Sequence, residues 1–365
     1  MYALFVIMEI VLYTNPPCLF IKKTQITIMP QTSRARYLDE AKGLGILCIV
    51  FLHYENGVIP WTVNTFIGSF MITIFYIIAG WIMAMKGKKI PTYNLAKKRL
   101  RSLGYPYIYW TGIILSFDII LWAFGYYDSY FIARETYKSI VLRGIGTLWF
   151  LPALFFGEII WNWLSKRHWS VWLLVLIVIM IYEHEYNNFF ASRTTPLWNI
   201  IKAPFYTISS TLCATITVGL GYIAYKIIHK LNLLDYKFLS FITGIAICIS
   251  AYLMANYLSL LLGNFNQYLW QLCAPIFGPI GFILIFYSSQ NNKLWNYFDY
   301  WGRNSLSLMV THYSIVQVLI TIFIVNLLHL PFLGWISILA FIASMPIQWS
   351  ITLWMNKNMP KLLHP

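Results

Sequence analysis

Residues 36–53 have the sequence RYLDEAKGLGILCIVFLH. Four charged side chains stand at the start of this stretch, an apolar run follows them, and the run ends in His53. An ionisable side chain within a membrane span is energetically expensive, and by default it marks a functional site. The stretch therefore predicts a first membrane helix with a charged mouth and a candidate catalytic histidine at depth.

The composition predicts an integral membrane protein. The chain has 365 residues, of which 59% are apolar and 10% are charged, whereas soluble domains carry about 25% charged residues. Its many apolar runs approach the roughly 20 residues that a membrane-spanning helix needs. We predict an all-α, polytopic integral membrane protein with about ten transmembrane helices. They are expected at residues 43–61, 65–85, 105–124, 147–165, 169–183, 205–226, 238–259, 269–288, 305–327 and 332–354. The fifth is short, and we expect it to be tilted or to extend into 183–188.

The distribution of positive charge predicts the orientation. The net charge is +14, and with ten spans 21 of the 26 Lys and Arg residues fall on one side. Because basic residues gather on the cytoplasmic side of membrane proteins, both termini are predicted to be cytoplasmic in a multi-pass protein of the cell (plasma or inner) membrane. The charge is thus a signal of topology, and nucleic acid is not an expected partner. The five scattered cysteines contain no C-x-x-C pair, so neither a disulfide framework nor a metal site is expected.

The chain is expected to contain one membrane domain. Residues 1–33 form an N-terminal extension, interrupted by Pro16-Pro17, and Met29 is an alternative start. Residues 34–356 form the membrane domain, and 357–365 form a short cytoplasmic tail. No repeat relates the two halves, which disfavours an inverted-repeat transporter.

Two histidines are expected at similar depth. His53 lies about ten residues into the first predicted span, which corresponds to ~15 Å, and His312 lies ~10 Å into the ninth. Neutral histidine can take a proton from a hydroxyl, which is the work of a general base. The alternative is a structural histidine that bonds to a neighbouring helix.

Several acids accompany them. Asp39 and Arg36 lie three residues apart and are expected to form an ion pair at the mouth of the first span. Asp39 is about 21 Å from His53 along a straight helix, so it cannot be a direct partner of the histidine. Glu55 is expected to line the outer half of the same cavity. Glu158 and Asp118 are expected to pair with buried cations.

A basic cluster, Lys97-Lys98-Arg99-Leu100-Arg101, precedes the third span. Such clusters bind lipid head groups or phosphorylated ligands. The alternative is an anchor that fixes the topology of the third span.

These motifs resemble the acyltransferase family 3 membrane proteins, and within them the branch related to fucose 4-O-acetylase. The Arg, Leu-Asp, Lys-Gly and His pattern of residues 36–53 carries the resemblance. Supporting matches follow in order over nearly the whole chain after residue 34; they are Phe75 and Gly80, Lys98-Arg99 with Pro106-Tyr107, Leu148-Trp149-Phe150-Leu151, and Gly302-Arg303-Asn304-Ser305-Leu306 with His312. The chain departs from the pattern at Met71, at Ala79, and at Ser102, which aligns with the family's second arginine.

The resemblance implies a membrane O-acyltransferase that moves an acyl group, most often acetyl, from cytoplasmic acyl-CoA to a hydroxyl of a sugar or of a cell-surface polysaccharide precursor. His53 is implied as the essential base and Arg99 as a donor-binding residue. Further candidates for acyl-CoA binding are Lys98, Arg101 and Arg36, and further candidates for catalysis or for the cavity lining are His312, Glu158 and Asp39. The expected partners are acyl-CoA as donor substrate, a carbohydrate or lipid-linked glycan, and membrane lipid. No bound cofactor is expected.

Two other functions fit the sequence. A transporter or flippase for a lipid-linked glycan precursor would also have about ten spans and buried histidines. An inactive relative that scaffolds a glycan-modifying machine would fit the altered positions Ala79 and Ser102.

Overall fold

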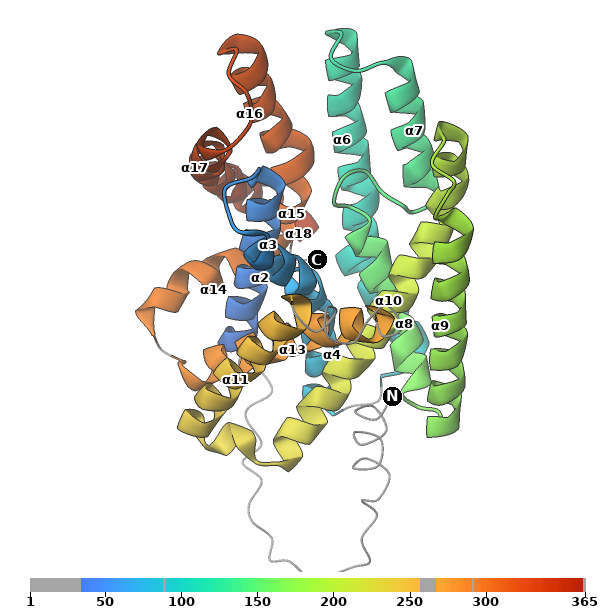
Figure 1. Cartoon of the computed structure of the whole chain (residues 1–365), viewed down its shortest axis with the longest axis vertical. Helices are drawn as coiled ribbons and strands as arrows, with labels where there is room; N and C mark the ends of the chain where they lie inside the picture. The colour runs from blue at the N-terminus through green and yellow to red at the C-terminus, as the bar shows by residue number, and fades with distance from the viewer. Residues whose placement is uncertain (1–33, 88–89, 257–266, 291, 364–365) are drawn as a thin grey trace, which may run out of the picture.

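In the computed structural model of this chain, the described residues are 34–365 without 88–89, 257–266, 291 and 364–365. The predicted N-terminal extension lies outside them. All elements within the described part are helices (Figure 1). The principal ones are α2 Arg36–Tyr54, α3 Trp61–Phe70, α4 Thr73–Lys86, α5 Thr92–Arg99, α6 Tyr105–Ala123, α7 Ser129–Ile140, α8 Phe150–Leu164, α9 Trp169–Phe190, α10 Pro196–Lys230, α11 Lys237–Asn256, α13 Gln267–Ser288, α14 Asn296–Arg303, α15 Ser305–Thr311, α16 Val318–Ile322, α17 Trp335–Asn358 and α18 Pro360–Leu363.

Seven helical stretches of the described part are long and apolar enough to cross a membrane. They are Trp61–Lys86, Thr92–Ala123, Trp169–Phe190, Pro196–Lys230, Lys237–Asn256, Ser305–Leu327 and Trp335–Asn358. An all-helical protein with several membrane helices is thereby confirmed, whereas the number of about ten is not. The other three predicted spans fall on α2, which carries four charged residues, and on the shorter apolar helices α8 and α13.

The first predicted span, 43–61, is displaced from the helix that forms there. Helix α2 begins at Arg36 and ends at Tyr54, so His53 lies in its last turn and not halfway along it. The chain turns immediately afterwards, because the Glu55 carboxylate accepts hydrogen bonds from the backbone N–H groups of Val58 and Ile59, at 2.7 and 3.0 Å. Burial alone would raise the pKa of Glu55, but these bonds and one from Asn64 lower it overall.

The helix that forms at the fifth predicted span is longer than the apolar run that predicted it. Helix α9 has 22 residues and reaches Phe190, so the expected extension beyond residue 183 is present.

Helix α2 lies between two hydrophobic clusters at the centre of the fold. On one face, Ile46 and Val50 pack with Trp110 of α6 and Leu308 of α15. On the other, Leu38 joins a cluster built from α4 and α13. Because both faces of α2 are packed, the orientation of the helix and of the residues in its last turn is fixed.

Glycines allow two pairs of helices to touch along their backbones. A Cβ on Gly43 of α2 would collide with the backbone of α14, and a Cβ on Gly302 of α14 would collide with the backbone of α2. Gly80 and Gly221 hold α4 against α10 in the same reciprocal way. Small residues are the usual means by which membrane helices approach closely. The segment that begins with Gly302 is thereby held against the charged end of α2.

Three segments within the long helices are π-helical. They are Leu100–Gly104 between α5 and α6, His312–Gln317 between α15 and α16, and Phe323–Leu327 after α16. Such segments are usually single wide turns inside an α-helix and are frequent at functional sites. The first two provide walls of the cavity described next.

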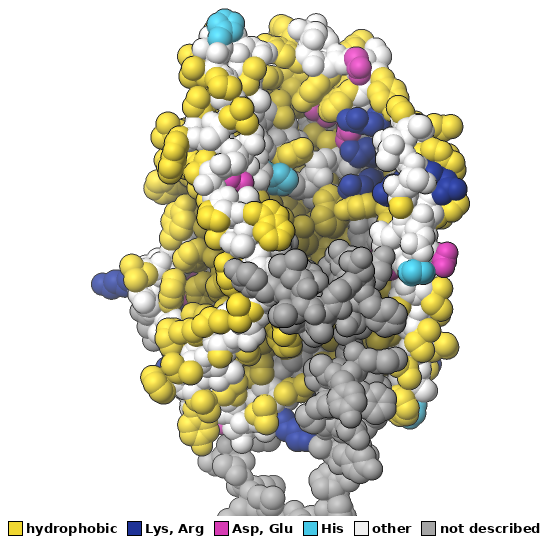
Figure 2. All heavy atoms as spheres, viewed as in Figure 1, with side chains coloured by type: hydrophobic (Ala, Val, Ile, Leu, Met, Phe, Trp, Pro, Cys, Tyr) yellow, Lys and Arg dark blue, Asp and Glu magenta, His cyan; other side chains and the backbone are white. Residues whose placement is uncertain are grey.

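Two arms rise on opposite sides of the molecule (Figure 1). One contains α15, α16 and α17, and the other contains α6 and α7. Tyr107 of α6 donates a hydrogen bond to the carbonyl of Ser139 in α7, at 2.8 Å, which ties α7 to α6. The face between the arms is hollowed, and Lys and Arg side chains gather along one wall (Figure 2).

Candidate functional site

A cavity of about 1030 Å³ lies between the two arms and reaches down to the start of α2. Its walls come from α2, α4, α6, α7, α8 and the α15–α16 segment. Charged side chains stand at both ends. The inner end of the cavity is the part lined by Arg34, Lys42, Arg99 and Arg303. The outer end is the part lined by Asp118, Tyr127, Phe131, Glu135 and Arg143. His53 lines the same cavity as both groups.

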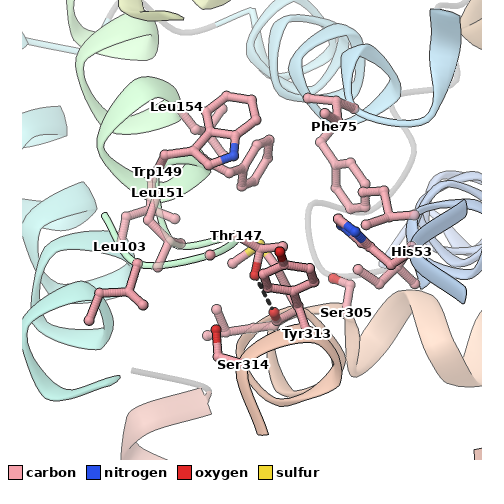
Figure 3. A pocket seen from close by; sticks show the side chains of 18 of the residues that line it. His53, Phe75, Leu103, Thr147, Trp149, Leu151, Leu154, Ser305, Tyr313 and Ser314 are labelled. Atoms are coloured by element: carbon pink, nitrogen blue, oxygen red, sulfur yellow. Dashed lines mark hydrogen bonds between the residues drawn. The ribbon is translucent and has the colours of Figure 1, made fainter. Parts of the chain in front are cut away.

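The His53 side chain points into this cavity (Figure 3). Its ring centroid lies 4.6 Å from that of Tyr313 and 5.3 Å from that of His312. Its backbone carbonyl accepts a hydrogen bond from the Gln317 side chain, which fixes the last turn of α2 against the opposite arm. Within the described residues neither ring nitrogen of His53 has a hydrogen-bond partner. The imidazole is therefore positioned by packing and free to bond to a ligand.

His312 is fully buried behind His53 and does not line the cavity. Its Nδ1 lies 2.8 Å from the carbonyl oxygen of Leu308. Because a carbonyl only accepts, Nδ1 carries the proton and Nε2 is left with a lone pair. No partner for Nε2 lies within the described residues. The two predicted histidines are thus neighbours, but only His53 can meet a substrate directly.

A loop closes the cavity on the side of α8. The Thr147 hydroxyl donates a hydrogen bond of 2.8 Å to the carbonyl of Met309, which links the loop before α8 to α15 (Figure 3). Trp149 and Leu151 follow directly and line the cavity. The Leu-Trp-Phe-Leu stretch singled out in the sequence therefore forms part of the wall.

Arg99 and Glu158 form an ion pair at the inner end. Arg99 Nε donates to Glu158 Oε2, and the Glu158 side chain is 2% exposed. Glu158 thus pairs with a cation as expected, although that cation is partly exposed and not buried. The terminal nitrogens of Arg99 have no hydrogen-bond partner among the described residues, so one edge of the guanidinium remains available.

The other residues of the basic cluster are placed differently. Lys98 and Arg101 are exposed and do not line the cavity. Ser102 does line it, and its buried hydroxyl has no partner within the described part.

The predicted ion pair between Asp39 and Arg36 does not form. Asp39 instead bonds to Arg34 and, at 3.1 Å, to Lys42. Arg36 pairs with Glu40 at 2.8 Å and donates to Asn296 of α14. Arg36 and Glu40 are four residues apart, a spacing that also brings helical side chains together. Arg36 thus joins α2 to α14 and lies outside the cavity lining.

Sequence reasoning missed three cations of the inner end as donor-binding candidates: Arg34, Lys42 and Arg303. Arg303 pairs with Asp299 one turn earlier, at 2.8 Å. The available signal was sequence position, because Arg34 and Lys42 flank Asp39 and Arg303 follows Gly302 of the late motif.

Two expectations about acids are wrong. Glu55 does not line the cavity and fixes the turn after α2 instead. Asp118 has no ion-pair partner among the described residues, although it is 3% exposed and lines the cavity at the outer end.

Residues 36–353 match the model of a family described as an acyltransferase domain. No curated protein and no solved structure matches.

Proposed function

Because the chain belongs to this family of membrane acyltransferases, we propose that it transfers an acyl group, and specifically acetyl, from cytoplasmic acyl-CoA to a hydroxyl of a sugar or surface-polysaccharide precursor. The observation that carries the proposal is the position of His53. Its ring projects into a large cavity without a hydrogen-bond partner in the described part (Figure 3). Charged side chains line both ends of this cavity.

The inner end supports binding of the donor. Coenzyme A carries phosphate groups, and arginine recognises phosphate through paired N–H donors. Glu158 holds Arg99 by Nε, so its terminal nitrogens are left for a ligand. Arg34 and Lys42 share one carboxylate, that of Asp39, so this trio retains a net positive charge. In the predicted orientation these side chains face the cytoplasm, where acyl-CoA is found.

The chemistry proposed for His53 is that of a general base. The acceptor hydroxyl gives its proton to an imidazole nitrogen while its oxygen attacks the thioester carbonyl carbon. A carbon–oxygen ester bond forms, the carbon–sulfur bond breaks, and the coenzyme A thiolate leaves and takes up the proton. Proton transfer of this kind accelerates reactions by about 10²–10⁴-fold. Tyr313 and His312 hold the imidazole plane by ring contacts.

Replacement of His53 tests the assignment. We expect His53→Ala to lower acetyl transfer from radiolabelled acetyl-CoA to membrane glycan by at least about 100-fold, because the base is lost. Acetyl-CoA binding should remain, because Arg99 and its neighbours are untouched. A matched control is His329→Asn, since His329 is exposed at a backbone φ of +53° that asparagine tolerates. Normal acetylation by His53→Ala, at normal protein level, would refute the assignment.

The alternative function is a glycan flippase, and an assay in the same membranes distinguishes it from an acyltransferase. A flippase would move its substrate without acyl-CoA, and the loss of acetyl-CoA would leave its rate unchanged. The proposed enzyme consumes acetyl-CoA in a His53-dependent manner.

A further inference from the structure

We propose that the outer end of the cavity is the binding site for the acceptor, a polyhydroxylated compound such as a sugar, in which Asp118 accepts hydrogen bonds from acceptor hydroxyls and Tyr127, supported from behind by Phe131, provides a stacking surface. The proposal rests on the function proposed above and deepens it, because it assigns acceptor recognition to residues distant from the family motifs.

Asp118 is a buried acid that lines the cavity. It lies on α6, five residues before the helix ends, and it is 3% exposed. Its Oδ2 atom is buried without a hydrogen-bond partner in the described part of the chain, and no cation there bonds to it. Among the described acids with such an atom, Glu40 and Glu183 are bonded through their other oxygen, whereas Asp118 is not, and its lack of any bonded partner needs an explanation. A carboxyl oxygen accepts hydrogen bonds, and a ligand rich in hydroxyl donors would satisfy it.

Aromatic rings lie beside this carboxylate. Tyr127 and Phe131 are stacked with their ring centroids 4.0 Å apart, and both line the cavity. The arrangement is fixed locally, because Asp128 begins α7 and its Oδ1 accepts a hydrogen bond of 2.6 Å from the backbone N–H of Phe131. Sugars present apolar C–H faces and polar edges, and an aromatic ring with a hydroxyl is suited to both.

The Tyr127 hydroxyl adds a donor to this surface. Burial, assisted by the nearby Asp118, raises the pKa of Tyr127 to about 12. The phenol therefore stays neutral at physiological pH.

Asp118, not the sum of the charges, distinguishes the outer end from the inner end. Glu135 bonds to Arg134 at 2.9 Å and to Lys138 at 2.8 Å, so this trio retains a net positive charge, as the corresponding trio at the inner end does. Arg143 has no bonded carboxylate among the described residues, and its guanidinium lies 3.6 Å from the ring centroid of Tyr206. One available acceptor, Asp118, and one available cationic donor, Arg143, thus face the same space. The dark blue wall of Figure 2 belongs to this end of the cavity.

The placement also separates the acceptor from the donor. Asp118 and Phe131 belong to the arm formed by α6 and α7, whereas Arg34 and Lys42 flank the start of α2. His53, in the last turn of α2, lines the cavity that both groups share (Figure 3). An acceptor held at the outer end can present one hydroxyl to His53 while other hydroxyls bond to Asp118.

The test compares Michaelis constants for the two substrates. The full chain is purified into lipid nanodiscs and supplied with radiolabelled acetyl-CoA and a panel of neutral methyl glycosides as acceptor probes. The variants are Asp118→Asn, which keeps the side-chain size, and Phe131→Ala. Their matched controls are Asp235→Asn and Phe238→Ala, which change exposed residues on other elements. Binding of acetyl-CoA reports that each variant is folded.

We expect Asp118→Asn to raise the KM for the glycoside by about tenfold, because one carboxyl oxygen becomes an NH2 group that cannot accept a hydrogen bond from an acceptor hydroxyl. The KM for acetyl-CoA should stay within about twofold of the wild-type value, and the controls should match wild type. Phe131→Ala should raise the glycoside KM in the same selective way. The Phe131→Ala variant still tests the proposal if Asp118→Asn fails to fold.

Three results would contradict the proposal. An unchanged glycoside KM in both variants would overturn it, and so would an equal rise in the KM for acetyl-CoA. A wild-type protein that consumes acetyl-CoA through His53 but acetylates no glycoside would overturn the acceptor class while leaving the acyltransferase function intact. A wild-type protein that neither binds nor consumes acetyl-CoA would instead refute the proposed function.

Discussion

One carboxyl group at the outer end of the cavity differs from all those at the inner end. At the inner end, Asp39 and Glu158 are each bonded to a cation. At the outer end, Glu135 is bonded to cations in the same way, but Asp118 has no bonded cation among the described residues. A carboxylate bonded to arginine fixes the direction of the guanidinium, whereas an unbonded one must find its hydrogen-bond donors in a ligand. The comparison leads us to propose that the inner end positions cations for the donor and that Asp118 at the outer end accepts hydroxyl groups.

The largest effect is expected from breaking the Arg99–Glu158 pair. Arg99→Ala leaves the buried Glu158 carboxylate uncompensated, which should lower the free energy of unfolding by about 3 kcal/mol. Acetyl-CoA affinity should fall as well, because the proposed contact between Arg99 and a phosphate is lost. The double variant Arg99→Ala/Glu158→Ala should recover stability but not affinity.

Thermal unfolding in detergent and acetyl-CoA titration separate these two effects. The matched control is Arg101→Ala, whose side chain is exposed and outside the cavity lining. If Arg99→Ala and Arg101→Ala weaken donor binding equally, the special role of Arg99 at the inner end is wrong.

A smaller loss is expected from separating α2 and α14. A Cβ at Gly302 would collide with the backbone of α2, so Gly302→Ala should lower the free energy of unfolding by about 1–3 kcal/mol. Because Arg303 follows it and lines the inner end, the KM for acetyl-CoA should rise while the acceptor KM stays nearly constant.

Gly112→Ala is the control for that variant, since a Cβ at Gly112 meets nothing within 4 Å. The measurement pairs unfolding temperature with both Michaelis constants. A rise in the acceptor KM equal to that of the donor would show that the two ends are not independent.

The smallest effect is expected from adding a cation to the inner end. Ser102 lines the cavity with an unbonded hydroxyl, and it aligns with an arginine of the family pattern. Ser102→Arg should lower the KM for acetyl-CoA by about threefold through an additional charge-assisted contact. Arg101→Ser, which removes charge from an exposed position, should have little influence. A donor KM that rises in Ser102→Arg would mean that this wall has no space for a phosphate-binding side chain.

The local features of the sequence predicted much of the fold and the central residue of the site. Apolar runs indicated the helices, and the energetic cost of an ionisable group among apolar residues singled out His53. The extension of α9 beyond residue 183 also followed from the short apolar run.

Contacts between distant residues were harder to predict. Nothing near Arg99 in the sequence indicates that its partner is Glu158, 59 residues later. The first span was placed at 43–61 by its apolar run, whereas helix α2 includes the charged residues before that run and ends at Tyr54. Asp118 was expected to find a cation, yet which side chains face it depends on how α7 packs beside α6.

The π-helical segment at Leu100–Gly104 has a consequence for comparing related chains. A π turn holds one more residue than the α turn that it replaces, while the flanking turns continue as before. Counting along the chain and following the helix face therefore disagree by one position around Arg101 and Ser102. Relatives should be aligned here by which residue faces the cavity, because a gap-free alignment can set an inward residue of one chain against an outward residue of another.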